Sequence, residues 1–219
     1  EEIDPPELRD EVLGIDLGVK TLATCSDGTT YQNPKPTRRY QNRIKRLQRK
    51  LHKYQKVPSN RRKETKKKIT KTHAKIRNIR KDNIHKATTD IVRAKQCRII
   101  VLEDLNVKGM VKNHCLARVI SETGMRVFRD TLTYKQKWAG GEVRFVDQFF
   151  PSSKTCSSCG YIKDKLKLSE RTFICENCGV SLDRDLNAAI NLKNTVSSTE
   201  IQGRGDPKVH AVNSAGEDL

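Results

Sequence analysis

Cys156-Ser-Ser-Cys159-Gly and Cys175-Glu-Asn-Cys178-Gly are the two short motifs around which this chain is organised. Fifteen residues separate the two Cys-x-x-Cys pairs, a spacing typical of a four-cysteine zinc ribbon in which each pair aims two thiolates at one tetrahedral ion. A glycine after each second cysteine supplies the backbone freedom that such tight turns need. We therefore predict a structural Zn²⁺ held by Cys156, Cys159, Cys175 and Cys178. Two disulfides are the alternative, which is disfavoured because nothing in the sequence indicates an oxidising compartment.

Two aspartates follow the second cysteine pair, in the segment Asp183-Arg-Asp185-Leu-Asn-Ala-Ala-Ile-Asn191. The apolar residues of this segment recur at helical spacing, so a helix is predicted to begin at the aspartates. A metal-bound ribbon would therefore fix the approach to a pair of carboxylates.

The composition indicates one main domain with insertions, since 35% of the 219 residues are hydrophobic. No apolar run approaches the roughly 18 residues of a membrane span, so we expect a soluble, cytoplasmic protein with no membrane partner. Three further cysteines, Cys25, Cys97 and Cys115, lie in or beside apolar segments and are predicted to be buried, unreactive thiols.

The net charge of +18 is concentrated in one segment. Residues 37–81 contain 20 lysines and arginines against one acid, Glu64, whereas the rest of the chain is almost neutral. This excess positive charge could simply keep a helical surface soluble, or it could bind phosphates. Like charges at helical spacing repel each other, so phosphate binding is the favoured explanation. We expect a polyanionic partner for this segment.

The first half of the chain predicts an antiparallel meander followed by two helices. Residues 12–19, 21–25 and 29–31 form the expected strands, and Asp16 lies in the middle of the first. A meander that opens with a buried aspartate begins a ribonuclease H-like sheet, although actin-like ATPases share this opening. Apolar residues at helical spacing then predict a basic helical pair, with a break and cap at 58–60 and the turns at 84–94 packed on the sheet.

The basic side chains of this insert are the predicted nucleic-acid contacts. They are Arg38, Arg39, Arg43, Arg46, Arg49, Lys50, Lys53, Arg61, Arg62, Lys66, Lys67, Lys71 and Lys75.

The second half predicts a buried strand at 98–103, ending at Glu103 and Asp104. Strand alternation points these two acids to opposite faces, so only one can enter a given site. One long helix, starting near residue 116 or 121 and ending at Trp138, and a strand over 142–150 are expected next. Residues 195–219 are predicted to be a disordered tail.

Asp16, Glu103 and Asp185, with Asp183 as a substitute for Asp185, are therefore the candidate catalytic carboxylates. Three acids brought together repel each other unless they bind cations, and hard oxygen ligands select Mg²⁺ or Mn²⁺. Two such ions about 3.5 to 4 Å apart clamp the attacking water and the leaving oxygen of a phosphodiester. This combination predicts phosphodiester hydrolysis.

Four ordered motifs also carry a family resemblance. They are Gly14-Ile-Asp16-Leu-Gly18, Ile100-Val-Leu-Glu103-Asp-Leu-Asn-Val-Lys-Gly-Met110, Phe150-Pro-Ser-Ser-Lys-Thr-Cys-Ser-Ser-Cys-Gly160 and Asp183-Arg-Asp-Leu-Asn-Ala-Ala-Ile-Asn191. Over about residues 12–194 the chain resembles the TnpB (OrfB) transposon-encoded proteins, compact relatives of type V CRISPR effectors.

The resemblance implies an α/β fold: a ribonuclease H-like (RuvC) mixed sheet with a basic helical insertion and an inserted four-cysteine zinc ribbon. The expected parts are a nuclease core at 12–150 with its insert at about 37–97, the ribbon at 151–180, and the last RuvC motif at 181–194. The implied activity is Mg²⁺-dependent, RNA-guided cleavage of double-stranded DNA, with guide RNA and target DNA as partners and a nucleoid-associated location in a prokaryotic cytoplasm. Carried over by position, Asp16, Glu103 and Asp185 are the implied ligands.

Members of this family usually carry an N-terminal region that helps hold the guide RNA and reads the DNA flanking the target. Here about a dozen residues precede the first nuclease motif, so residues 1–11 are expected to be a leader or the remnant of an absent domain. A nuclease-domain fragment, a product of internal translation and a reduced relative that needs a separate chain for this domain all remain open. A non-cleaving RNA-guided DNA-binding protein or an accessory subunit is the alternative function. An actin-like ATPase would need phosphate-binding Gly-rich loops that the sequence lacks.

Overall fold

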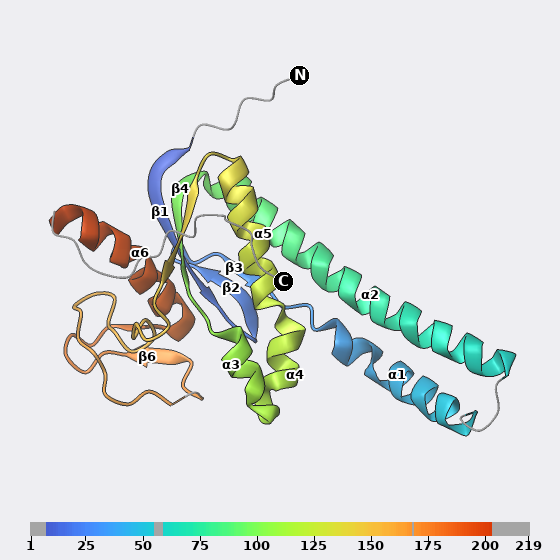
Figure 1. The fold of residues 1–219 in the computed structure, drawn as a ribbon. Helices are drawn as coiled ribbons and strands as arrows, with labels where there is room; N and C mark the ends of the chain where they lie inside the picture. Colours follow the sequence, from blue (N-terminus) through green and yellow to red (C-terminus); the bar gives the residue numbers. More distant parts are fainter. Residues whose placement is uncertain (1–7, 55–58, 168, 203–219) are drawn as a thin grey trace, which may run out of the picture.

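A five-stranded mixed sheet forms the centre of the computed structural model, which describes residues 8–54, 59–167 and 169–202 (Figure 1). The strand order is β3-β2-β1-β4-β5, with β2 antiparallel to β1 and β3, and β4 parallel to β1 and β5. The strands are β1 (Arg9–Leu17), β2 (Thr21–Cys25), β3 (Thr30–Gln32), β4 (Cys97–Glu103) and β5 (Glu142–Val146). The predicted meander and the predicted buried strand thus pair in one sheet.

The helices lie between and after these strands. They are α1 (Pro36–Lys53), α2 (Asn60–Asp90), the π-helical turn η1 (Ile91–Lys95), α3 (Val107–Lys112), α4 (His114–Thr123), α5 (Met125–Trp138) and α6 (Arg184–Gln202). A separate two-stranded sheet pairs β6 (Thr172–Ile174) with β7 (Ser181–Asp183), so this hairpin crosses the boundary expected at residue 180.

Helices cover both faces of the central sheet. On one face, Phe128 and Leu132 of α5 join Ile84 near the end of α2 in a core cluster with alternate residues of β1 and β4. On the other face, Leu192 of α6 packs with Val101 of β4. Because side chains alternate along a strand, this arrangement divides the residues of β1 and β4 between an α5 side and an α6 side.

Gly14 lets α6 lie directly on β1. A Cβ at this position would overlap the carbonyl oxygen of Ala189 and stand 2.5 Å from the backbone nitrogen of Lys193. The glycine therefore brings the backbone of α6 closer to the sheet than any side chain would allow. This contact positions the start of α6 relative to the end of β1.

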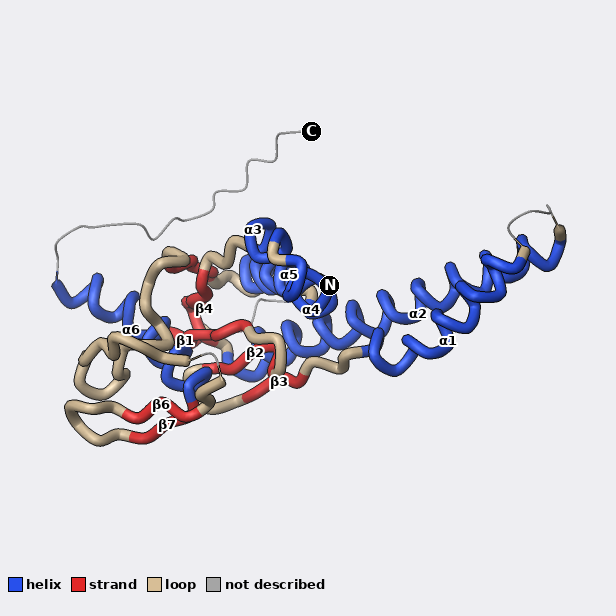
Figure 2. The backbone as a smooth tube through the Cα atoms, turned by 90° about the horizontal axis from the view of Figure 1, so that it is seen from below, coloured by secondary structure: helices blue, strands red, loops and turns tan. Residues whose placement is uncertain are grey.

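The basic insert forms a helical hairpin, α1 and α2, that extends away from the sheet on the side opposite the β6–β7 sheet (Figures 1 and 2). Ile44 and Leu47 of α1 and Ile76 of α2 are buried in it. The predicted cap of the second helix is confirmed, since the Ser59 hydroxyl accepts a hydrogen bond from the Arg62 backbone nitrogen at 3.3 Å. The predicted packing of the 84–94 turns on the sheet is also confirmed, with Ile91 fully buried.

The structure corrects three predicted boundaries. The single long helix before Trp138 is wrong: Gly124, with φ 74°, separates α4 from α5, and the Arg80 and Ile84 side chains of α2 lie against it. The strand over 142–150 ends at Val146 because Asp147 begins a turn.

The third correction concerns the end of the chain. Helix α6 continues past Asn194 to Gln202, with Val196 buried in the α6-side core, where the sequence predicted the start of the tail. Residues 1–7, 203–219 and the predicted break at Pro58 lie outside the described residues. Among those that are described, no helix is long and apolar enough to cross a membrane.

Candidate functional site

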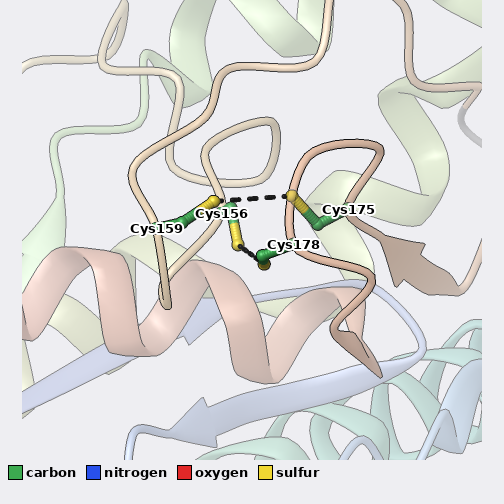
Figure 3. Close-up of side chains that lie close together, drawn as sticks. All are labelled: Cys156, Cys159, Cys175 and Cys178. Atoms are coloured by element: carbon green, nitrogen blue, oxygen red, sulfur yellow. Dashed lines mark hydrogen bonds between the residues drawn. The ribbon is translucent and has the colours of Figure 1, made fainter.

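The four predicted zinc ligands come together at one point. The Sγ atoms of Cys156, Cys159, Cys175 and Cys178 all lie within 4.8 Å of one another (Figure 3). The Cys156–Cys178 and Cys159–Cys175 sulfur pairs are 3.7 and 3.6 Å apart. A tetrahedral ion with metal–sulfur bonds of about 2.3 Å separates its ligands by about 3.8 Å, so this cluster could hold a metal ion.

Both cysteine pairs use the same turn. The amide of Gly160 donates to the carbonyl of Cys156 at 2.9 Å, and Gly179 repeats this bond to Cys175 at 3.1 Å. Both glycines have positive φ, 75° and 73°, and so use the backbone freedom for which the sequence singled them out. The repeated turn explains why each pair presents both sulfurs to one point.

Hydrogen bonds favour the thiolate at Cys159, whereas the neighbouring sulfurs raise the pKa of Cys178 to about 11. A backbone donor from Tyr161 and the Asn177 side chain, whose amide is 3.6 Å from the sulfur, lower the pKa of Cys159 to about 6. Sulfur separations of 3.6 Å or more are far from the roughly 2.05 Å of a disulfide bond, so the disulfide alternative is wrong. Of the remaining thiols, Cys25 and Cys97 are buried as predicted, and burial raises the pKa of Cys25 to about 12; the Cys115 side chain lies outside the description.

Two buried asparagines tie the ribbon to α6. The Asn187 amide donates to the Thr155 carbonyl at 2.7 Å, and its oxygen accepts from the Ser157 nitrogen at 3.0 Å. One helical turn later, Asn191 donates to the carbonyls of Ser152 at 2.7 Å and Thr155 at 2.6 Å. The segment that enters the first cysteine pair is thereby bound to α6 by two buried side chains.

The predicted carboxylates lie where β1, β4 and α6 meet. In the parallel β1–β4 register, Ile15 is opposite Leu102, which brings Asp16 alongside Glu103. Glu103 alternates with Ile99 and Val101, which face α6, whereas Asp104 accepts a 2.7 Å bond from Arg129 of α5. Glu103 and Asp104 therefore have different partners, although both residues border the same cavity at the end of the sheet.

Burial and mutual repulsion both act on Asp16. Loss of water raises the pKa of Asp16 to about 7, and the neighbouring carboxylates of Asp185 and Glu103 contribute to this rise. Burial alone raises the pKa of Glu103 to about 7. Asp16 therefore lies close enough to the other two acids to be repelled by both, and cations would relieve that repulsion.

The two aspartates of the last motif have different partners. Asp183 is exposed, and its Oδ1 accepts hydrogen bonds from the backbone nitrogens of Asp185 at 2.9 Å and Leu186 at 3.1 Å, so it caps α6. Asp185 lies in the first turn, 19% exposed, with its Oδ1 3.1 Å from Nη2 of Arg184. The carboxylate of Asp183 is therefore engaged in capping α6, whereas the carboxylate of Asp185 lies beside Asp16.

The carboxylates are more widely spaced than the thiols. Within residues 8–54, 59–167 and 169–202, the cysteines form the only group of three or more potential ligand side chains that lie within 4.8 Å of one another. Glu103 also borders a cavity of about 470 Å³, whose wall includes Asp147, Gln148 and Arg126. The cavity opens at the end of the sheet where β4 and β5 finish.

The predicted nucleic-acid contacts lie on the α1–α2 hairpin, and all thirteen are exposed except the partly buried Arg62. Glu64, the only acid of the segment, is paired with Lys68 at 3.8 Å. The hairpin surface is therefore almost uniformly positive.

Sequence reasoning missed the positioning roles of Asn187, Asn191 and Arg184. The available signal was two asparagines one turn apart on the apolar face of a predicted helix, where an unpaired amide would be costly. Arg184 also reaches back to the carbonyl of Glu170, 3.1 Å away, next to the ribbon.

Two family models match the chain. Residues 1–114 match OrfB_IS605, described as a probable transposase, and residues 126–192 match the model described as Cas12f1-like, TNB domain.

Named proteins and a solved structure are also similar. A "Putative RNA-guided DNA endonuclease" of Streptomyces pristinaespiralis is 40% identical over 190 residues, which are 87% of this chain and 46% of that protein. The "Putative RNA-guided DNA endonuclease InsQ" of Escherichia coli K12 is 36% identical over 196 residues, 83% of this chain and 48% of that protein. The chain thus spans about half the length of these relatives.

The structure titled "Cryo-EM structure of the Cas12f1-sgRNA-target DNA complex" matches with a TM-score of 0.57 at 23% identity, covering 89% of this chain and 51% of that one. At this identity the match shows a shared fold. Since the OrfB_IS605 model covers more than half of the residues and its motifs are those of TnpB (OrfB) proteins, the chain belongs to the OrfB_IS605 family of probable transposases.

Proposed function

We propose that this chain is the nuclease part of an RNA-guided DNA endonuclease and hydrolyses DNA phosphodiesters in a RuvC-like site. The observation that carries the proposal is the β1–β4 register, which sets Asp16 beside Glu103 under the first turn of α6. The repulsion that raises the pKa of Asp16 involves the same three acids that the sequence singled out.

The sheet supports a ribonuclease H-like assignment. Its order, β3-β2-β1-β4-β5, combines an antiparallel meander with parallel strands, and Asp16 lies on the central strand. In this proposal residues 12–150 are the nuclease core, with the basic insert at about 37–97, and the ribbon delivers the last acidic motif.

The donor set suits hard divalent cations, because three partly buried carboxylates offer oxygen ligands and excess negative charge. Mg²⁺ or Mn²⁺ bound there would activate water for attack on phosphorus and stabilise the leaving oxygen. Asp16 lies between the other two acids and would contribute to both ions, while Glu103 and Asp185 would each hold one side. Arg184 restrains the carboxylate of Asp185 next to Asp16.

The ribbon is proposed to bind Zn²⁺ and to act structurally. Its four thiols have the spacing of a tetrahedral thiolate site, and Asn187 and Asn191 connect that site to α6. Zinc would therefore hold Asp185 in place without contacting the substrate.

Guide RNA and target DNA are the proposed partners, supported by the names of the relatives and by the RNA and DNA named in the Cas12f1 structure. The hairpin would grip phosphates of the RNA or of the guide–target duplex, recognising shape and charge rather than bases. A separate chain could supply further guide-binding surface, and a location at the nucleoid follows from these partners.

The test is cleavage of labelled single- and double-stranded DNA by the purified chain with its co-purifying RNA, with and without Mg²⁺. Glu103→Gln should abolish cutting, a loss of at least about 100-fold, and leave binding largely intact because it removes a metal ligand and no phosphate contact. Glu142→Gln is the matched control, since this exposed acid lies at the far end of β5.

Retained Mg²⁺-dependent cutting by the Glu103 variant would defeat the assignment. Salt-sensitive binding without cleavage by the wild-type chain would favour a nuclease-domain fragment or a non-cleaving, DNA-binding accessory subunit.

A further inference from the structure

Phe149 is the most exposed large hydrophobic side chain in the described part of the protein, with 82% of its surface accessible. A phenyl ring left in water forgoes the free energy that burial would provide. Its neighbour Phe150 does pack, partly buried, against the cluster that contains Val146 and Leu192. The chain therefore buries one of two consecutive aromatic rings and leaves the other in solvent.

The exposure of Phe149 is built into an ordered turn. Its backbone nitrogen donates to Oδ1 of Asp147 at 2.8 Å, and the next nitrogen donates to the Asp147 carbonyl at 3.0 Å. Strand β5 ends immediately before this turn, and the packed Phe150 follows it. The backbone that carries the exposed ring is thus held on both sides.

The turn also forms part of the wall of the cavity beside Glu103. Asp147 and Gln148, the two residues before Phe149, line this cavity together with Arg126 and Arg129 of α5. Arg126 is 64% exposed, and its ion pair with Asp130, at 3.7 Å, is long. The turn that carries the exposed ring and the exposed guanidinium of Arg126 therefore border one cavity that reaches a proposed catalytic acid.

This combination suits an unpaired nucleotide. Aromatic side chains bind single-stranded nucleic acid by stacking on base faces, while neighbouring cations track the phosphates. A protein segment that covered the ring would need an apolar surface, whereas the cavity wall carries five charged side chains, the acids Glu103, Asp104 and Asp147 and the arginines Arg126 and Arg129. Arg129 is paired with Asp104, so Arg126 is the cation that remains for a phosphate. We propose that Phe149 is a stacking platform for an unpaired base of the strand that enters the cavity beside Glu103; this rests on the proposed function.

The experiment places the only indole of the chain at this position. The sequence has one tryptophan, Trp138, which is 78% exposed and precedes β5, whereas Phe149 follows that strand. In the double variant Trp138→Phe, Phe149→Trp, titration with single-stranded oligothymidylate in EDTA should quench the indole fluorescence. The wild-type chain, whose indole is at position 138, is the matched control and should show little quenching.

Affinity measurements give the second readout. Phe149→Ala and Phe149→Leu should weaken oligothymidylate binding about 5- to 150-fold, and Phe149→Tyr should restore it, because only an aromatic ring offers a stacking face. Trp138→Ala should stay within about twofold of wild type, since stacking losses are larger than this. Blunt duplex DNA, whose bases are already stacked, should be bound about equally by the Phe149 variants and wild type.

Absence of quenching at position 149, or equal quenching at position 138, would overturn the proposal. An unchanged oligothymidylate affinity in Phe149→Ala would also overturn it. If the melting temperature of that variant were lower while its affinity stayed unchanged, the ring would instead make a contact within the protein. Binding in EDTA does not require cleavage, so the two proposals can fail separately. Quenching in a chain that cuts no DNA would support the stacking platform and contradict the proposed nuclease activity. Cleavage without quenching would support the nuclease activity and contradict the stacking platform.

Discussion

At the residue scale, Asp16 is the most informative group of the molecule. Its carboxyl loses water on folding and faces two further acids, and these effects raise its pKa from 3.8 to about 7. A position selected for stability alone would not keep an acid in such a place. The free-energy cost of burying Asp16 beside two acids is explained by a bound cation that compensates the negative charge.

The pH dependence of stability follows from this shift. The folded state keeps the Asp16 proton up to about pH 7, whereas the unfolded chain releases it near pH 4, so folding binds a proton between these values. The stability of the metal-free chain should therefore fall as the pH rises from about 4 to about 7.

Asp16→Asn should remove this loss. In EDTA at pH 8 the variant is expected to melt about 2 to 8 °C above wild type, and at pH 4 the difference should disappear. Mg²⁺ should raise the melting temperature of wild type at pH 8 more than that of the variant. Asp10→Asn, on the exposed start of β1, is the control. A variant that melts at or below the wild-type temperature in EDTA at pH 8 would contradict the electrostatic account.

At the element scale, α6 is held from two sides. Gly14 allows its backbone to lie on β1, and Asn187 and Asn191 bind it to the segment before the first cysteine pair. The cysteine cluster and the carboxylate cluster are therefore connected through one helix. A change in the ribbon should be felt at Asp185.

Cys175→Ser tests this connection. It should lower the zinc content from about one ion per chain, since a thiolate is a far better zinc ligand than a hydroxyl. Amide hydrogen exchange should then increase at the start of α6, over residues 184–191, because the ribbon no longer restrains it. Elemental analysis and mass-resolved exchange provide the measurements.

Cys25→Ala is the control, because Cys25 is buried in β2, far along the chain from the ribbon, and its loss should leave the zinc content unchanged. Full zinc content in Cys175→Ser would count against a four-thiolate site. Loss of zinc without faster exchange in α6 would show that the asparagine contacts hold the helix without the metal.

At the scale of the whole molecule, the positively charged surface and the candidate catalytic carboxylates lie on different parts of the fold. The α1–α2 hairpin carries the positive surface and extends from one side of the sheet, while the ribbon lies on the other side (Figure 2). The acids lie between these parts, at the end of the central strands.

The salt dependence of binding measures this surface. Lys67→Gln with Lys71→Gln should lower the slope of log affinity against log salt by up to about 2 on duplex nucleic acid, since each lost phosphate contact removes about 0.9. Lys20→Gln with Lys112→Gln, two exposed lysines outside the hairpin, is the matched control. Equal slopes for the two double variants would show that the hairpin does not carry the contacts.

The sequence by itself determined the parts that depend on neighbouring residues. Cysteine spacing predicted the metal-binding cluster, strand patterns predicted the meander and the strand ending at Glu103, and the charge count located the basic hairpin. Each of these signals lies within a few turns of chain, where local geometry decides the outcome.

Only the tertiary structure decided what depends on contacts between distant segments. At Gly124 the chain takes a positive φ where the Arg80 and Ile84 side chains of α2 lie beside it, and the distinct environments of Asp183 and Asp185 depend on how α6 packs against the ribbon and β1. The two aspartates are nearly equivalent along the chain. Packing places Asp183 at the end of α6 and Asp185 beside Asp16, because burial and charge repulsion depend on position in space.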